Sequence, residues 1–184
     1  MNIAVIFAGG TGQRMNSKTK PKQFLKLHGK PILIYTVEQF QIHEQIDAII
    51  IVCIENWISY CQKLVEDFGL DKVVDIIPGG YNGQNSIFQG IQRAYSLYEK
   101  DSIVLIHDGV RPLVDEETIS KNITSVKEYG SAITTVPVIE TIVQNDDAGK
   151  IVSITERKGS VDKRKKNGFL YGILIIPIAG GHFL

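Results

Sequence analysis

Residues 2–12 read NIAVIFAGGTG, an apolar run that leads directly into a loop with three glycines, and the fold is inferred from this stretch. Residues 2–8 are apolar and rich in β-formers, which predicts a first strand. A second apolar run, at residues 48–53, shows no alternation with polar residues. Such continuous runs are typical of strands that helices cover on both faces. The two runs therefore indicate a sheet buried between layers of helices.

Strands and helices alternate along most of the chain that follows. Apolar runs predict strands at residues 2–8, 48–53, 73–77, 103–107 and 131–136. Helical spacing predicts helices that begin at Pro31 and that cover residues 57–68, 85–98 and 116–129. This order predicts an α/β fold of the Rossmann-like type, a mostly parallel sheet flanked by helices. Ligands in such folds bind beyond the carboxyl ends of the strands, which selects the loops after Ala8, Ile77 and Ile106.

The rhythm changes from residue 137 onward. Short β-like runs at 140–144 and 151–155 flank a turn-rich stretch, which predicts a β-hairpin arm that projects from the sheet. Residues 169–184 contain no charged residue, but they are too short and too broken by Gly and Pro for a membrane span of about 20 apolar residues. We expect one domain over residues 1–160, including the arm at 137–157, and an atypical tail over 161–184 that is buried or poorly ordered.

The composition of the chain excludes several classes of protein. Its 184 residues carry 20 Lys and Arg against 20 Asp and Glu, whereas dedicated nucleic-acid binders show a basic excess. Cys53 and Cys61 are too few for a disulfide framework and are expected to be reduced core thiols. The first residues show no secretory signal. We therefore expect a cytoplasmic protein with no nucleic-acid or membrane partner.

The glycine loop after the first strand is a candidate phosphate site, because glycines let backbone N–H groups approach an anion closely. It is neither a Walker A loop nor a dinucleotide fingerprint, since Met15 stands where the latter needs its last glycine. Arg14 and Lys22 follow it, and Pro21 restricts the backbone before Lys22. Fixed cations stabilise the charge that develops during nucleotidyl transfer. The alternative is a tight turn with solvated surface lysines.

Six segments occur in order along the chain: GGTGQRM at 9–15, PKQFL at 21–25, GKPIL at 29–33, GGYNGQNS at 79–86, HDGVRP at 107–112 and VPVIET at 136–141. In this order they resemble the CTP-dependent cytidylyltransferases of sugar and polyol phosphates. That family includes 2-C-methyl-D-erythritol 4-phosphate cytidylyltransferase and ribitol-5-phosphate cytidylyltransferase. The resemblance covers about residues 2–158 and is far more specific than any single segment.

The resemblance implies a fold of the nucleotide-diphospho-sugar transferase type and a cytidylyltransferase activity. CMP would pass from CTP to a sugar or polyol phosphate, with release of pyrophosphate. Trp57 and the loop at 81–86 are closer to the ribitol-phosphate type, so ribitol 5-phosphate is favoured over 2-C-methyl-D-erythritol 4-phosphate. The resemblance also implies Mg²⁺ as cofactor and a homodimer paired through the arm at 137–157.

The resemblance assigns a role to each matched residue. The catalytic cations would be Arg14 and Lys22, and the metal ligand would be Asp108. The acceptor phosphate would contact Arg111, Thr141 and Arg157. The nucleotide would contact Ala8, Gly9, Gly10, Thr11, Gly12, Gly79, Gly80, Gly83 and Ser86. Mg²⁺ prefers one or two carboxylates together with phosphate oxygens and water, although a turn or helix-cap aspartate remains the alternative for Asp108. His107 is expected to be a hydrogen-bonded packing residue.

The sequence departs from the family pattern at three places. Gly83 stands where Arg is common, and Glu140 stands where Asp is common. After Arg157 the family's Thr-Pro-Gln segment, second metal-binding Asp and late Lys are missing, which leads us to expect a truncated or frame-shifted chain with weak or absent turnover. One alternative is a catalytically impaired CTP-binding or dimerising module. Another is a nicotinamide-dependent dehydrogenase with Glu55 at the ribose, which leaves Lys22 and Asp108 unexplained.

Overall fold

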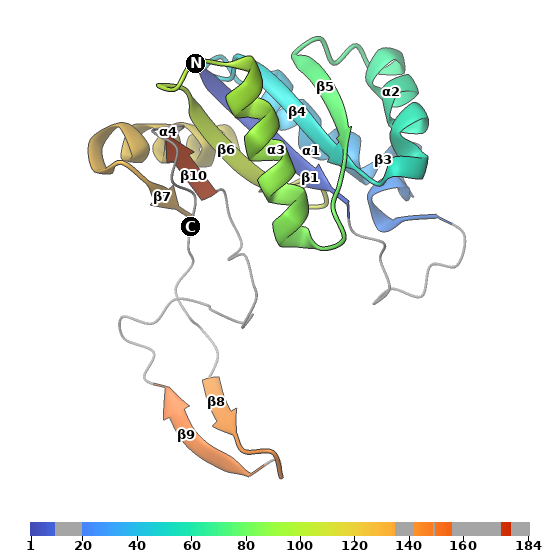
Figure 1. Cartoon of the computed structure of the whole chain (residues 1–184). Helices are drawn as coiled ribbons and strands as arrows, with labels where there is room; N and C mark the ends of the chain where they lie inside the picture. The colour runs from blue at the N-terminus through green and yellow to red at the C-terminus, as the bar shows by residue number, and fades with distance from the viewer. Residues whose placement is uncertain (10–19, 135–141, 149, 156–173, 178–184) are drawn as a thin grey trace. The chain divides into compact units, whose positions relative to one another are not determined.

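A six-stranded sheet with helices on both faces is the central feature of the computed structural model (Figure 1). The structure describes residues 1–9, 20–134, 142–148, 150–155 and 174–177. In spatial order the strands are β5 (Val73–Pro78), β4 (Ala48–Cys53), β1 (Asn2–Ala8), β6 (Ile103–Asp108), β10 (Leu174–Pro177) and β7 (Ala132–Ile133). The first four run parallel, and β10 runs antiparallel to β6. The predicted Rossmann-like architecture is confirmed.

The chain divides into two compact units, Met1–Ala132 with Ile173–Leu184, and Ile133–Gly172. The first unit holds the four parallel strands, the antiparallel strand β10 and the helices. The helices are α1 (Ile32–Gln41), α2 (Ile58–Asp67), α3 (Gly83–Leu97) and α4 (Glu116–Tyr129), with short 3₁₀ turns η2 (Lys22–Phe24) and η3 (Glu55–Trp57). No helix in the described part of the chain is long and apolar enough to cross a membrane.

Successive residues of β1 pack into separate cores on the two faces of the sheet. Ala4 and Ile6 contact the core formed with α1, α2 and α4, whereas Ile3 and Val5 contact the core formed with α3. All four side chains are fully buried. In Figure 1, α3 crosses in front of the sheet and α1 lies behind it. Each buried Ile or Val contributes about 1.5–3 kcal/mol, which explains why continuous apolar runs form these strands.

Local signals placed several boundaries accurately. The predicted strands at 2–8 and 48–53 and the predicted helix at 116–129 have the observed bounds. The Asp115 side chain caps α4 by accepting a hydrogen bond from the Thr118 backbone N–H at 2.8 Å, and Gly130, at φ 82°, ends it. Cys53 and Cys61 are free and buried, as expected.

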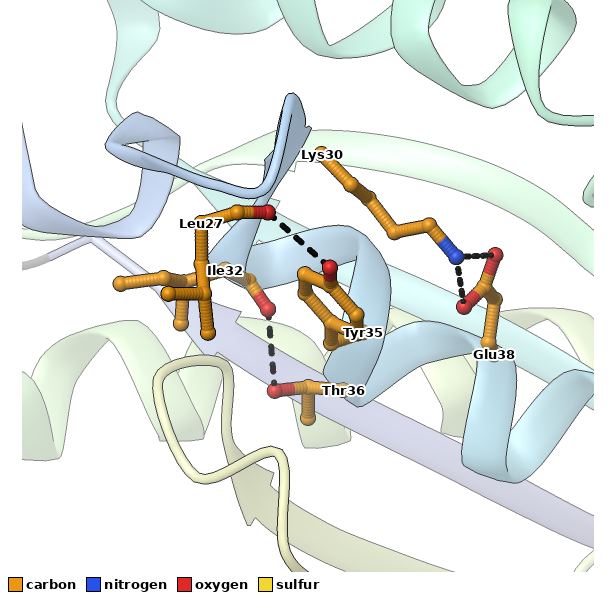
Figure 2. Close-up of polar contacts among 6 residues, drawn as sticks. All are labelled: Leu27, Lys30, Ile32, Tyr35, Thr36 and Glu38. Carbon is orange, nitrogen blue, oxygen red and sulfur yellow. Dashed lines mark hydrogen bonds and ion pairs between the residues drawn. The ribbon is translucent and has the colours of Figure 1, made fainter.

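A small hairpin connects η2 to α1. Its strands are β2 (Lys26–Leu27) and β3 (Lys30–Pro31). His28 and Gly29 form the turn with φ of 48° and 84°, the conformation of a turn that matches strand twist. Figure 2 shows how the hairpin is held on α1: the Tyr35 hydroxyl donates to the Leu27 carbonyl at 3.0 Å, and the Lys30 ammonium contacts both carboxylate oxygens of Glu38 at 2.7 Å.

The second unit contains the predicted hairpin. Strands β8 (Ile142–Asn145) and β9 (Ile151–Thr155) pair antiparallel, with Ile142 opposite Thr155. Of the first predicted strand, at 140–144, the structure describes the part from Ile142 onward, and residues 135–141 lie outside the described residues.

The tail expected over residues 161–184 contains strand β10, and the rest of this tail lies outside the described residues. Ile175 of β10 pairs with Leu105 of β6, so this segment extends the sheet past β6. The strand predicted at 131–136 is described only as Ala132–Ile133, next to β10. A short apolar run is typical of a strand, but its partner is set by contacts distant in sequence.

Candidate functional site

The carboxyl end of β1 is the point where the predicted loops meet. A Cβ built on Gly9 would lie 3.1 Å from Ser86 Oγ and 3.8 Å from the Gly79 Cα. A Cβ on Gly79 would lie 3.0 Å from the same hydroxyl and 3.4 Å from the Cys53 carbonyl, which accepts the Gly79 N–H at 2.7 Å. At either position, a Cβ would require the Ser86 hydroxyl to move by a few tenths of an ångström. The structure thus brings Gly9, Gly79 and Ser86 together next to Ala8, and their contact with a nucleotide stays a prediction.

The loop between β5 and α3 is shaped by its own hydrogen bonds. The Ser86 hydroxyl accepts from the Gly80 N–H at 3.1 Å and donates to the Asn82 carbonyl at 2.9 Å. Asn82 Oδ1 accepts from the Asn85 N–H at 2.8 Å and caps α3. Ser86 is 2% exposed, so its hydroxyl serves the loop backbone. Its contribution is to hold the N–H groups of this loop beside the end of β1.

Gly83 is the one predicted glycine of this loop with open space around it. A Cβ there would have nothing within 4 Å, and its backbone is not in the left-handed region. The fold therefore accommodates a side chain at this position, which fits the Arg that is common in the family.

The loop after β6 packs against the same end of β1. The Gly109 N–H donates to the Phe7 carbonyl at 3.0 Å, and a Cβ on Gly109 would lie 3.2 Å from the Ala8 Cβ. The Thr36 hydroxyl of α1 donates to the Gly109 carbonyl at 3.1 Å. These contacts hold Asp108 at the carboxyl edge of the sheet. Sequence reasoning missed Thr36, because a Thr inside a helical run gives no signal of a tertiary hydrogen bond.

Asp108 and Arg111 form a partly exposed ion pair, with Asp108 Oδ2 3.4 Å from Arg111 Nε. The other carboxylate oxygen accepts the Val110 N–H at 3.1 Å, as in an aspartate-stabilised turn. The described residues hold no group of three or more His, Cys, Asp or Glu that would bind a metal by themselves. Asp108 thus offers one carboxylate at this end of the sheet, and its role as a ligand of Mg²⁺ stays a prediction.

His107 lies between the sheet and α1. Its ring packs against Phe40 with the ring centroids 5.1 Å apart. Burial lowers the pKa of His107 to about 4, so the imidazole is neutral at neutral pH. The predicted packing role is supported, but the expected hydrogen bonding is incomplete, because Nδ1 has no partner among the described residues.

Lys22 opens the turn η2, and the next residue ties that turn to β1. Gln23 Nε2 donates a hydrogen bond to the Ala8 carbonyl. The side chain of Gln23 is 1% exposed. Gln23 lies within the PKQFL segment, but the sequence alone predicted no role for it. The Lys22 turn and the Asp108 loop therefore both contact the last residues of β1.

Six predicted site residues lie outside the described residues: Gly10, Thr11, Gly12, Arg14, Thr141 and Arg157. Their roles stay predictions. The approach of Arg14 to Lys22 and Asp108 therefore stays a prediction as well.

The parallel sheet, with glycine loops and a lysine turn at its carboxyl edge, defines a Rossmann-like α/β protein with a candidate phosphate site at the usual edge. The family described as IspD, 2-C-methyl-D-erythritol 4-phosphate cytidylyltransferase, matches residues 2–176. The chain belongs to this family. The match runs past residue 158, where the resemblance seen in the segments ends, and reaches into β10.

Relatives in the family carry two names. A ribitol-5-phosphate cytidylyltransferase of Streptococcus agalactiae serotype Ia is 51% identical over 177 residues, which are 96% of this chain and 74% of the relative. A 2-C-methyl-D-erythritol 4-phosphate cytidylyltransferase of Clostridium botulinum type Ba4 is 35% identical over 175 residues, 95% of this chain and 74% of the relative. The family assignment leaves the dehydrogenase alternative without support.

The fold is also that of a solved structure. The crystal structure of 4-diphosphocytidyl-2C-methyl-D-erythritol synthase from Anaerococcus prevotii has a TM-score of 0.76 at 21% identity, over 96% of this chain and 71% of that one. At this identity the likeness shows the fold alone, which agrees with the predicted Rossmann-like sheet.

Proposed function

We propose that the chain transfers the cytidylyl group of CTP to ribitol 5-phosphate, forming CDP-ribitol and pyrophosphate. The observation that carries this proposal is the meeting of the Gly79–Ser86 loop, the Asp108 loop and the Lys22 turn at the end of β1, in a member of this family. The choice of acceptor follows the higher identity to the ribitol-5-phosphate relative, 51% against 35% for the methylerythritol-phosphate relative.

The proposed reaction is an in-line displacement at the α-phosphorus of CTP. A phosphate oxygen of the acceptor forms the new P–O bond, and the bond from the α-phosphorus to the bridging oxygen breaks. Pyrophosphate leaves with that electron pair. No general base is required, because a phosphate dianion is already nucleophilic. Lys22 and Arg14 would neutralise the developing charge, and the glycine loops would orient the nucleotide, so positioning and electrostatics supply most of the rate.

Asp108 is the residue that would hold Mg²⁺, and the ion when bound would supply charge neutralisation on the phosphates. Arg111 is proposed to bind the acceptor phosphate. Because Arg111 now pairs with the Asp108 carboxylate at 3.4 Å, the cation and the phosphate would each take one partner of that ion pair. The two ligands are then expected to favour each other's binding.

The test is a steady-state assay of pyrophosphate release by the purified chain, with CTP and each acceptor in turn. Ribitol 5-phosphate should give a kcat/KM at least about tenfold above that of 2-C-methyl-D-erythritol 4-phosphate, since one good hydrogen bond is worth that factor. Preference for the second acceptor would contradict the assignment. Tight CTP binding without release with any acceptor would support the alternative of a CTP-binding module.

We further propose that the hairpin β8–β9 joins two copies of the chain. A two-stranded hairpin is at best marginally stable in water, so this one requires a surface to pack on. Val152 of β9 is 60% exposed within the chain and offers an apolar contact. Light scattering should give the mass of two chains, and Val152→Asp should give the mass of one. A single-chain mass for the unmodified protein would remove this proposal.

A further inference from the structure

The residues around Lys22 are held to the fold on two sides. On one side, Gln23 Nε2 donates to the carbonyl of Ala8, the last residue of β1. This bond is buried, and a hydrogen bond is stronger in such surroundings than in water. Ala8 is also held in register by β4, where it pairs with Cys53. Gln23 thus connects the lysine turn directly to the strand that leads into the glycine loop.

The other side of the turn rests on aromatic rings. The fully buried ring of Phe24 stacks on Trp57 with centroids 5.0 Å apart, and it meets Tyr60 edge-on at 5.3 Å. The Lys20 ammonium lies 4.5 Å from the centre of the Tyr60 ring and 3.0 Å from its hydroxyl. Lys20 is therefore engaged by aromatic groups.

The side chain of Lys22 differs from those of Lys20 and Gln23 in its contacts. The Lys22 carbonyl accepts the Leu25 N–H at 3.2 Å, but the Lys22 ammonium makes no hydrogen bond or ion pair with any of the described residues, and the residue is partly exposed. A cation that stabilises a transition state must be held in position before reaction, and a shift of about 1 Å in such a group costs up to about 100-fold in rate. The backbone of Lys22 is held by its neighbours, while its ammonium is left available.

We propose that Gln23 is a positioning residue for cytidylyl transfer, which fixes the Lys22 turn against the carboxyl end of β1 beside the glycine loop. This inference rests on the proposed function. Gln23 acts through Lys22 and does not touch substrate. If Gln23 served only to pair with the Ala8 carbonyl, its loss would lower stability. Any effect of that loss on catalysis would then be the same whether Lys22 is present or not.

The experiment is a double-mutant cycle with Gln23→Leu and Lys22→Ala in the pyrophosphate-release assay with CTP and ribitol 5-phosphate. Gln23→Leu alone should lower kcat about 10- to 100-fold with a smaller change in KM for CTP. On the Lys22→Ala background the same change should cost less than about threefold, because residues that act as a unit are not additive.

The matched control is Gln41→Leu. Gln41 Oε1 accepts the Lys72 N–H at 2.9 Å, a part-buried bond between residues distant in sequence that lies just before β5, at the amino end of that strand. This variant should keep kcat within about twofold of the unmodified protein. Near-ultraviolet circular dichroism and thermal unfolding check that each variant is folded. Gln23→Asn, which keeps the amide but is too short to reach Ala8, replaces Gln23→Leu if the latter does not fold.

The outcomes separate the two proposals. If the unmodified protein is active and Gln23→Leu lowers kcat by the same factor with Lys22 and with Lys22→Ala, the positioning role is overturned. The proposed function then still stands. Loss of the fold in both Gln23 variants also overturns the positioning role, because Gln23 is then a structural residue. An unmodified protein that neither binds CTP by calorimetry nor releases pyrophosphate overturns the proposed function, and this inference falls with it.

Discussion

Gly90 of α3 is the position where the packing of a helix on the sheet can be tested most directly. A Cβ built on Gly90 would lie 2.4 Å from Val5 Cγ1 and 2.9 Å from Val52 Cγ2. Both valines are fully buried in central strands, and a β-branched side chain has few alternative rotamers there. Gly90→Ala therefore forces α3 away from β1 and β4.

The expected loss of stability follows from two opposing terms. Extra atoms in a well-packed core cost about 1–3 kcal/mol, while Ala in place of Gly inside a helix returns about 1 kcal/mol. The net change is a loss of up to about 2 kcal/mol in the free energy of unfolding, or up to about 8 °C in melting temperature for a chain of this size. Because α3 begins beside the Gly79–Ser86 loop, the KM for CTP should rise as well.

Gly83→Ala is the control in the same helix. Its Cβ would meet nothing within 4 Å, so the substitution should raise stability by about 0.4–1 kcal/mol through the unfolded state. Urea unfolding at 25 °C measures the change in the free energy of unfolding for Gly90→Ala and for Gly83→Ala, and the m-value should stay unchanged in both. Equal stability of the two variants would show that α3 does not approach the sheet as closely as the structure indicates.

Three further changes have expected outcomes. Burial lowers the pKa of His107 from 6.5 to about 4, so between these pH values the unfolded chain binds a proton that the folded chain does not. The free energy of unfolding should therefore fall by about 3 kcal/mol as the pH falls from 6.5 to 4. His107→Leu should flatten this part of the plot of unfolding free energy against pH. Asp108→Asn keeps an oxygen to accept the Val110 N–H but loses the charge, so activity should require at least about tenfold more Mg²⁺, and a Mg²⁺ titration with unchanged midpoint would argue against Asp108 as the ligand. His28→Gly removes the strain of a non-glycine residue at a φ of 48° and should raise the free energy of unfolding by about 1 kcal/mol. A calorimetric scan should show this as a higher melting temperature.

Much of the fold was predictable because its signals are local. The apolar run of β1 and the capped helix α4 are encoded within a few residues, and their bounds were predicted directly. The placement of Gly9, Gly79 and Asp108 at the carboxyl end of the sheet was predictable, because each comes just after a predicted strand. The contacts of Gln23 and Thr36 were not predictable, because their partners lie 15 and 73 residues away in the chain.

The amino-acid sequence by itself determined the alternation of strands and helices, the mostly parallel direction of the strands, and the family. Hydrophobic periodicity and the order of motifs are properties of the chain alone. The tertiary structure decided which loops share the end of β1, that Gln23 joins the Lys22 turn to Ala8, and that residues 174–177 pair with β6. The physical reason is that such contacts depend on which surfaces are buried together, and a hydrogen bond between distant residues is specified by the packed fold and not by either partner's neighbours.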